Sequence, residues 1–285
     1  MTGPAASPDA AGSRSSRLLG SPSAGRGVVV SLTSAVLFFG LIGWAVVNSP
    51  NWDEFQRAFL DPEVFADAFP KILGAFWLNV RLFLLCEVLI LVLGLVIAVM
   101  RSLPGPVFFP LRLVAVIYAD FFRGVPGIVV IYVLGLGLPS LGIEGVPVDE
   151  FFWAAVALTL IYSAYVSEVY RAGIDSVHPS QEAAARSLGL SRTQAMRHVV
   201  LPQAVRRVIP PLLNDFIGLQ KDTALVAFIG VVEAFRRSET LSGASFNLTP
   251  YVATALIFLI LTVPMARFVD WLVARDRRRF LASAR

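Results

Sequence analysis

The chain has 285 residues, of which 56% are hydrophobic and only 15% are charged, and its mean hydropathy is +0.71. Ordinary soluble domains are roughly 45–50% apolar, so this composition excludes a typical soluble globular protein and indicates a membrane protein. The net charge of +4 comes almost entirely from arginine. Because the arginines cluster beside apolar segments, where they set membrane topology, they do not indicate nucleic-acid binding.

The sequence contains few of the Cys and His residues that bind metals or form disulfides, namely one Cys and two His. Cys86 is the single cysteine and lies in an apolar run, so no internal disulfide is possible and a buried apolar role is expected. His178 and His198 share one basic segment, without an H-E-x-x-H or paired-cysteine pattern. No nucleophile, base and orienting residue fall into a recognisable pattern, and no close carboxylate pair stands out. The sequence therefore predicts neither an enzyme nor a bound cofactor or metal.

The N-terminal part combines a polar tail with one apolar segment. Residues 1–27 are rich in Ser, Gly, Ala and Pro, which predicts a disordered tail. Val28–Val47 is uncharged and apolar, and about 20 such residues cross a bilayer core. A cleaved signal peptide would have an apolar part of roughly 7–15 residues followed by a small-x-small site, which does not fit. We therefore expect an uncleaved span.

An acidic stretch, residues 48–71, separates this first span from the rest of the chain. Five further apolar segments are predicted to cross the membrane, at about 73–100, 111–138, 151–171, 208–235 and 251–273. The turn "RSLPGP" (Arg101–Pro106) separates the first two. Within the second, Pro126 in "FRGVPG" predicts a kink or a break. The predicted fold is an all-α integral membrane protein with about six transmembrane helices.

The distribution of charge between the spans predicts the orientation. Arginines concentrate in four places, 1–27, 101–112, 172–207 and 274–285, whereas the alternate loops 48–71 and 139–150 are acidic. Cytoplasmic loops carry the excess of positive charge. Both termini and the segment 172–207 are therefore predicted to be cytoplasmic.

The cytoplasmic segment 172–207 is predicted to form two short helices. Pro179 suits the first turn of one helix, and Gly189 suits the left-handed residue that ends it. Ser191, followed three residues later by Gln194, is a capping-box pattern for the second helix, which Pro202 is expected to close.

The first of these helices, about residues 180–188, is expected to dock against another surface. It is only about 13 Å long at 1.5 Å per residue, which is too short for stability in isolation. Gln181, Ala185 and Leu188 are predicted to share one face. A helix that lies on lipid carries large apolar side chains such as Trp or Phe, whereas this one carries Ala. We therefore favour docking in a protein groove, and a lipid surface is the alternative.

The sequence of this segment resembles the cytoplasmic loop of ABC importer permeases, and more specifically that of the polar amino acid branch. "EAAARSLGLSRTQAMRHVVLPQA" (Glu182–Ala204) carries the family's Gly at Gly189 and its Leu-Pro at Leu201 and Pro202. Three other segments match the same branch in the same order, namely "YADFFRGVPGIVV" (Tyr118–Val130), "SAYVSEVYRAGIDSV" (Ser163–Val177) and "PPLLNDFIGLQKDTALV" (Pro210–Val226). Together the matches cover about Leu73–Arg275.

The sequence departs from the family pattern at one notable position. In the register that Gly189 fixes, the family's Glu position holds Ala183, and the Glu lies one place earlier, at Glu182. A contact that the family's Glu makes with its ATPase would therefore be altered. "RGVP" in place of "RGTP" and "KDTAL" in place of "KDTSL" are smaller differences.

The resemblance implies a type I ABC importer-like permease core over residues 73–275. An extra span and an acidic extracytoplasmic loop (28–72) would precede it, and a basic cytoplasmic tail (276–285) would follow. It implies that the short helix couples to an ATPase, through Gln181, Glu182, Ala183, Ala184, Ala185, Arg186, Leu188 and Gly189. Because the chain has no Walker A sequence, the ATPase that uses ATP and Mg must be another polypeptide.

The resemblance also implies the function and the other partners. The chain would be the permease subunit that moves polar amino acids into a bacterial cell through the cell membrane. An extracytoplasmic binding protein would deliver the solute, and a second permease copy or a homologue would complete the pore. One alternative is import of another small polar solute, such as an opine. An alternative of another class is an ion channel or membrane scaffold without an ATPase, which has no use for the short helix.

Charged residues within the predicted spans are candidates for function, because such residues usually face a bundle interior or a cavity. They are Glu87, Asp120, Arg123, Glu168, Arg171, Lys221 and Asp222. Glu168 and Arg171 lie three residues apart and are predicted to pair as a structural clamp near the cytoplasmic end. Glu87 faces either a partner subunit or the pore.

A translocation path or gate is predicted where helices break. Arg123 and Pro126 flank the predicted break of one span, and Arg123 is either a structural brace or a pore-lining residue. Lys221 and Asp222 divide the span 208–235 into two pieces, and a break near mid-membrane often marks a translocation path. With Glu168, these residues form the predicted path.

Overall fold

The computed structural model describes residues 22–283, and all regular secondary structure within that range is helical. Of the predicted disordered tail, residues 1–21 lie outside the described part. The first helix, α2 (Pro22–Val47), begins at Pro22, before the predicted start at Val28. The chain divides into two compact units, and the boundary in the sequence lies between Ala58 and Phe59.

The first unit contains α2 and most of α3 (Trp52–Phe59). The stretch Val29–Val47 of α2 is long and apolar enough to cross a membrane. Residues 48–71 were predicted to form a polar loop, but α3 lies inside this range and the next helix, α4 (Pro62–Ser102), begins inside it. The Trp52 and Phe55 rings of α3 stack with their centroids 5.6 Å apart, while the first turn of α3 carries two carboxylates that favour a helix N-terminus.

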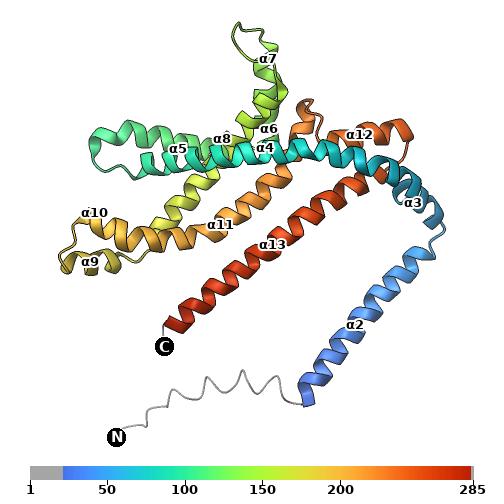
Figure 1. Ribbon diagram of the computed structural model, residues 1–285, viewed down its shortest axis with the longest axis horizontal. Helices are drawn as coiled ribbons and strands as arrows, with labels where there is room; N and C mark the ends of the chain where they lie inside the picture. Colours follow the sequence, from blue (N-terminus) through green and yellow to red (C-terminus); the bar gives the residue numbers. More distant parts are fainter. Residues whose placement is uncertain (1–21, 284–285) are drawn as a thin grey trace. The chain divides into compact units, whose positions relative to one another are not determined.

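The second unit forms a helical assembly around the long helix α4 (Figure 1). In chain order its elements are α4 (Pro62–Ser102), η2 (Pro106–Phe108), α5 (Phe109–Gly124), α6 (Gly127–Tyr132), η3 (Val133–Gly137), α7 (Leu138–Ser140), α8 (Glu150–Asp175), α9 (Pro179–Ser187), α10 (Arg192–Ala195), η4 (Met196–Val200), α11 (Leu201–Asp222), η5 (Thr223–Ile229), α12 (Ala234–Ser245) and α13 (Thr249–Ser283).

The two central helices begin at aspartate caps. Asp61 precedes α4, and its side chain accepts hydrogen bonds from the backbone N–H groups of Glu63 and Val64, at 2.9 and 3.1 Å. Asp149 precedes α8 and accepts from the N–H of Phe152 at 2.6 Å. An aspartate cap satisfies amides that have no partner in the first turn, so the sequence fixes where both helices start.

Close packing of α4 against α8 forms the core of this unit. A side chain on Gly94 would place its Cβ only 2.7 Å from Cγ1 of Val166, so the glycine allows the two helices to approach. The buried positions of α8 are mostly small, namely Ala154, Ala155, Ala157, Ser163, Ala164 and Ser167. Small residues at contacts are typical of helix packing in membranes, where close approach provides the contact energy.

Of the described residues, four helical stretches are long and apolar enough to cross a membrane, and a fifth crossing results if one bent pair forms a single span. About six spans were predicted. The predicted span 208–235 does not qualify, because α11 carries Asp215 and Lys221, ends at Asp222 and continues as η5. The chain is nevertheless a multi-pass membrane protein. The structure also adds α12, which was not predicted.

Candidate functional site

The short helix α9 lies between two long helices, and backbone caps define both of its ends. His178 is its N-cap, and Nδ1 of that ring accepts from the N–H of Ser180 at 3.2 Å. Pro179 takes the first turn, as predicted. Gly189 follows the helix with φ of 89°, the left-handed conformation expected from the sequence. Its N–H donates to the carbonyl of Arg186 at 3.0 Å. These caps satisfy backbone groups at both ends of α9.

The exposed surface of α9 differs from the predicted face. Ala185 is buried, but Gln181 is exposed and Leu188, at the C-cap, is 85% exposed. The three residues predicted to share one face therefore differ in exposure, and Leu188 lies at the C-cap, where the helix ends. Of the residues predicted to couple to an ATPase, those that are exposed are Gln181, Ala183, Ala184, Arg186, Leu188 and Gly189.

Glu182 turns toward the neighbouring helix. It is half-buried, and its Oε1 lies 3.9 Å from Nε of Arg192, the first residue of α10. Ala183, which occupies the family's Glu position, is exposed. The shift of the glutamate by one position therefore rotates it into an interaction within the loop, and a methyl group stands at the surface instead.

The second short helix begins as predicted but does not end as predicted. The capping box is present: Gln194 N–H donates to Oγ of Ser191 at 3.3 Å, and Ser191 N–H donates to Oε1 of Gln194 at 2.8 Å. Pro202 was expected to close this helix. Instead the chain passes through the wide π turn η4 directly into α11, and Pro202 lies in the first turn of α11, where a missing N–H is tolerated.

A cluster of ion pairs joins three helices near this segment. The carboxylate of Glu168 on α8 accepts from Arg101 of α4 and lies 3.2 Å from Nη1 of Arg123 of α5. It also pairs with Arg171 at 2.8 Å, as the three-residue spacing predicts. Arg171 in turn reaches Asp175 at 2.8 Å. One glutamate thus links α4, α5 and α8.

The predicted break next to Arg123 is present. Val125 is extended, with φ of −90° and ψ of 132°, and Pro126 is the N-cap of α6. The residue before a proline avoids the helical conformation, which explains where α5 ends. The two pieces, Pro106–Gly124 and Gly127–Ser140, meet at an angle of 104°. Arg123 therefore lies at the bend and is held there by Glu168.

At the second predicted break, α11 gives way to the 3₁₀ helix η5 without a gap in the chain. α11 ends at Asp222, and Lys221 beside it is exposed. The hydroxyl of Tyr162 on α8 donates to Oδ2 of Asp222 at 2.8 Å. The two charged residues predicted as one pair thus have different surroundings, because the carboxylate faces α8 while the ammonium group is exposed.

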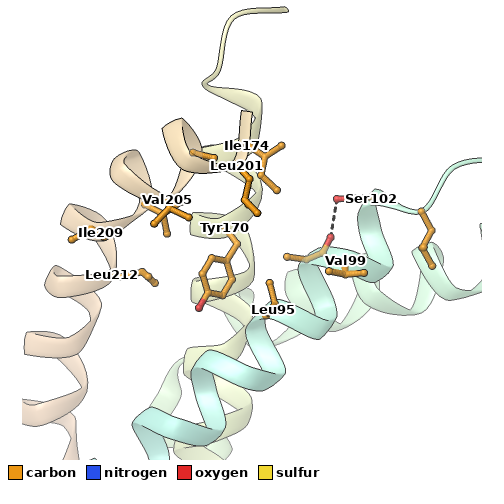
Figure 2. Close-up of a pocket in the computed structure, with 13 residues that line it drawn as sticks. Leu95, Val99, Ser102, Tyr170, Ile174, Leu201, Val205, Ile209 and Leu212 are labelled. Carbon is orange, nitrogen blue, oxygen red and sulfur yellow. Dashed lines mark hydrogen bonds between the residues drawn. The ribbon is translucent and has the colours of Figure 1, made fainter. Parts of the chain in front are cut away.

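An apolar groove of about 480 Å³ lies between the ends of α4, α8 and α11 that adjoin the short helices (Figure 2). Figure 2 shows Leu95 and Val99 on one side, Tyr170 between, and Val205 and Ile209 on the other. The first half of α11, which continues directly from the α9–α10 segment, is therefore separated from α4 by a hollow.

The remaining charged candidates are not drawn into these clusters. Glu87 is half-buried on α4, and Asp120 is exposed on α5. Sequence reasoning missed Asn79 and Glu233, which are fully buried and hydrogen-bonded to each other at 2.8 Å. The sequence signal that could have identified Glu233 was the presence of a carboxylate within the predicted apolar span 208–235. Among the described residues, no group of three His, Cys, Asp or Glu could hold a metal ion.

The sequence matches a known transport family and several ABC transporter permeases. Residues 90–278 match the family described as "Binding-protein-dependent transport system inner membrane component". The chain is 36% identical over 190 residues to the probable glutamine ABC transporter permease protein GlnM of Bacillus subtilis (strain 168), covering 66% of this chain and 85% of that protein. It is 33% identical over 195 residues to the arginine transport system permease protein ArtQ of the same organism, covering 68% and 87%.

Solved structures of ABC transporters also resemble this chain. A chain from the crystal structure of an amino acid ABC transporter with histidines superposes with a TM-score of 0.69 at 31% identity, covering 75% of this chain and 98% of that chain. A chain of the MetNI methionine ABC transporter shares the fold, with a TM-score of 0.58 at 17% identity, covering 72% and 95%. The chain thus belongs to the family of binding-protein-dependent transport system inner membrane components, with the fold of a type I ABC importer permease.

Proposed function

We propose that this chain is the subunit through which an ABC importer moves polar amino acids into a bacterial cell, driven by a separate ATPase that docks on α9. The observation that carries the proposal is the exposed, doubly capped helix α9 between α8 and α11. A helix of nine residues is not stable alone and gains stability by packing against a partner. Because Ala183 and Ala184 are small and exposed, a partner can approach the α9 backbone closely.

The connection of α9 to the rest of the chain supports transmission of movement. On one side, α9 is joined through His178 to α8, whose Glu168 ties α4 and α5 together. On the other side, α10 and η4 continue into α11 without a break. A displacement of α9 would therefore move α11 against a clamped group of helices, and the apolar groove provides room for this movement.

Amino acids are the proposed solutes because the relatives that cover most of this chain are named for glutamine, arginine and amino acids generally. An extracytoplasmic binding protein would deliver the solute and two permease subunits would form the pore. The path would pass Arg123, Pro126, Glu168, Lys221 and Asp222. ATP and Mg would be used by the partner ATPase and not by this chain, and both termini would be cytoplasmic.

Reconstitution in liposomes tests the proposal. The permease is combined with its ATPase and binding protein, and uptake of labelled glutamine, histidine and arginine is measured with and without ATP. A chain that lacks Gln181–Leu188 should insert normally but lose ATP-driven uptake. Uptake that persists after this deletion would contradict the coupling role. Uptake of an opine but of no amino acid would instead support the alternative solute class.

A further inference from the structure

Three residues that are far apart in the sequence form a polar network inside the second unit. Asn79 on α4, Thr223 at the start of η5 and Glu233 just before α12 expose 1%, 0% and 0% of their surface. Burial of a carboxylate is strongly unfavourable unless hydrogen bonds compensate for the lost water. The burial of these three side chains therefore has to be compensated by hydrogen bonds within the network.

The side-chain amide of Asn79 makes three hydrogen bonds, each to the η5–α12 region. Its Nδ2 donates to Oε2 of Glu233 at 2.8 Å and to Oγ1 of Thr223 at 3.1 Å. Its Oδ1 accepts from the backbone N–H of Ala234 at 3.1 Å. One side chain on α4 therefore holds both ends of the connection that runs from residue 223 to residue 233.

Glu233 is at the same time the N-cap of α12. Its Oε2 accepts from the N–H of Phe235 at 2.9 Å, and its Oε1 accepts from the N–H of Arg236 at 2.7 Å. With Asn79, the carboxylate accepts three hydrogen bonds at the N-terminus of a helix, where negative charge is favoured. This accounts for an acidic residue at a fully buried position.

We propose that Asn79 and Glu233 are positioning residues that fix the segment Thr223–Glu233 to α4, so that this segment stays in place while α11 moves during transport. This segment directly follows α11, whose last two residues are Lys221 and Asp222. The inference rests on the proposed function, since it assigns a role within the transport cycle. The same segment also packs its apolar residues Val226, Ile229 and Val231 into the core that contains Leu82 of α4.

The donor and acceptor pattern gives this inference a specific test. N79D places a carboxylate opposite a carboxylate. E233Q removes one acceptor. Its single amide oxygen can replace either Oε2, which accepts from Asn79 and Phe235, or Oε1, which accepts from Arg236, so at least one of these donors loses its partner. The double variant N79D/E233Q restores an NH₂ group opposite a carboxylate at the contact with α4, while that NH₂ group also faces the N–H of Phe235 in the cap of α12. Exposed Glu239, which pairs with Arg236 on α12, provides the matched control E239Q.

The first measurement is the number of solute molecules moved per ATP hydrolysed by the reconstituted transporter. Each single variant should lower this ratio about tenfold, because a buried polar group left without a partner destabilises the arrangement. The double variant should recover most of the ratio, and E239Q should match the wild type. Single variants that keep the wild-type ratio, or a double variant no better than the worse single variant, would overturn the inference.

The second measurement does not depend on transport. Amide hydrogen exchange of the permease in detergent reports opening of the N-terminal turn of α12. Exchange at Ala234, whose N–H donates to Oδ1 of Asn79, should be faster in each single variant and return toward wild type in the double variant. Wild-type exchange in both single variants would contradict the hydrogen-bonded positioning itself. A wild-type transporter without ATP-driven uptake would contradict the proposed function, whereas the exchange result concerns only the positioning.

Discussion

Nη1 of Arg123, the last charged residue before the break between α5 and α6, lies 3.2 Å from Oε1 of Glu168 on α8. The same Oε1 accepts from Arg101 of α4, so the bent span is held to the two central helices by one carboxylate. The side chain of Glu168 is 17% exposed, which limits the screening of these interactions by solvent. The bend and the clamp therefore form a single structural unit.

Removal of the Glu168 charge should destabilise this unit strongly. E168Q leaves three arginines without their shared anionic partner. The cost of about 3–5 kcal/mol that is typical of a broken buried ion pair applies to Arg101, which is 13% exposed, because Arg123 and Arg171 are 42% exposed. The midpoint of thermal unfolding in detergent should fall clearly. R267Q is the control, because Arg267 and Asp270 are largely exposed and such pairs contribute about 0–1 kcal/mol. Equal midpoints for the two variants would contradict the role of the clamp.

Replacement of Gly189 should weaken ATPase binding. G189A places a side chain on a residue with φ of 89°, which costs roughly 1 kcal/mol, or about a fivefold change in Kd. The affinity for the ATPase, measured by titration in detergent, should fall by this factor. Gly105 has the same φ of 89° in a turn outside the α9–α10 segment, so G105A should bind normally. Weakening by both variants alike would indicate general strain instead of a role of α9.

A larger side chain in the groove should slow transport. V205F places an aromatic ring in the apolar groove between α11 and α4, which Val205 lines (Figure 2). If α11 moves into this space, turnover should fall severalfold while the ATPase still binds. V263F on α13 adds the same ring at an exposed position outside the groove and should transport normally. Normal turnover of V205F would mean that the groove stays open throughout the cycle.

Loss of one hydroxyl should alter the break at the end of α11. Y162F removes the donor to Oδ2 of Asp222, and a half-buried carboxylate without its donor is destabilised by about 1–3 kcal/mol. The predicted result is a lower maximal rate of uptake with nearly unchanged ATPase binding. Tyr165 lies one turn further along α8 and is 40% exposed, so Y165F is the control. An unchanged rate of uptake in Y162F would contradict a role of Asp222 in the translocation path or gate.

The sequence predicted those features that depend on local backbone chemistry. Pro126 broke its span as expected, Gly189 adopted the left-handed conformation, and Ser191 with Gln194 formed the capping box. The pairing of Glu168 with Arg171 also followed from spacing along one helix. Each of these features involves residues only a few positions apart, so the geometry of one turn or one helix was sufficient.

Features that depend on contacts between distant segments were missed. Pro202 did not end its helix, because the preceding π turn accommodates it within a continuous path into α11. Arg101 and Arg123 join Glu168 from other helices. Asn79 and Glu233 are 154 residues apart in the chain, and only the fold brings them together. Periodicity of hydrophobic residues carries no information about such pairs.

The central claim, docking of an ATPase on α9, is tested most directly by thiol labelling. Ala184 is exposed and its neighbour Ala185 is buried, so A184C and A185C form a matched pair, and buried Cys86 should not react. Inside-out vesicles are treated with a membrane-impermeant maleimide, with and without the ATPase. The predicted result is rapid labelling of A184C that the ATPase suppresses, with slow labelling of A185C in both conditions. Labelling of A184C at the same rate with the ATPase bound would contradict docking at α9.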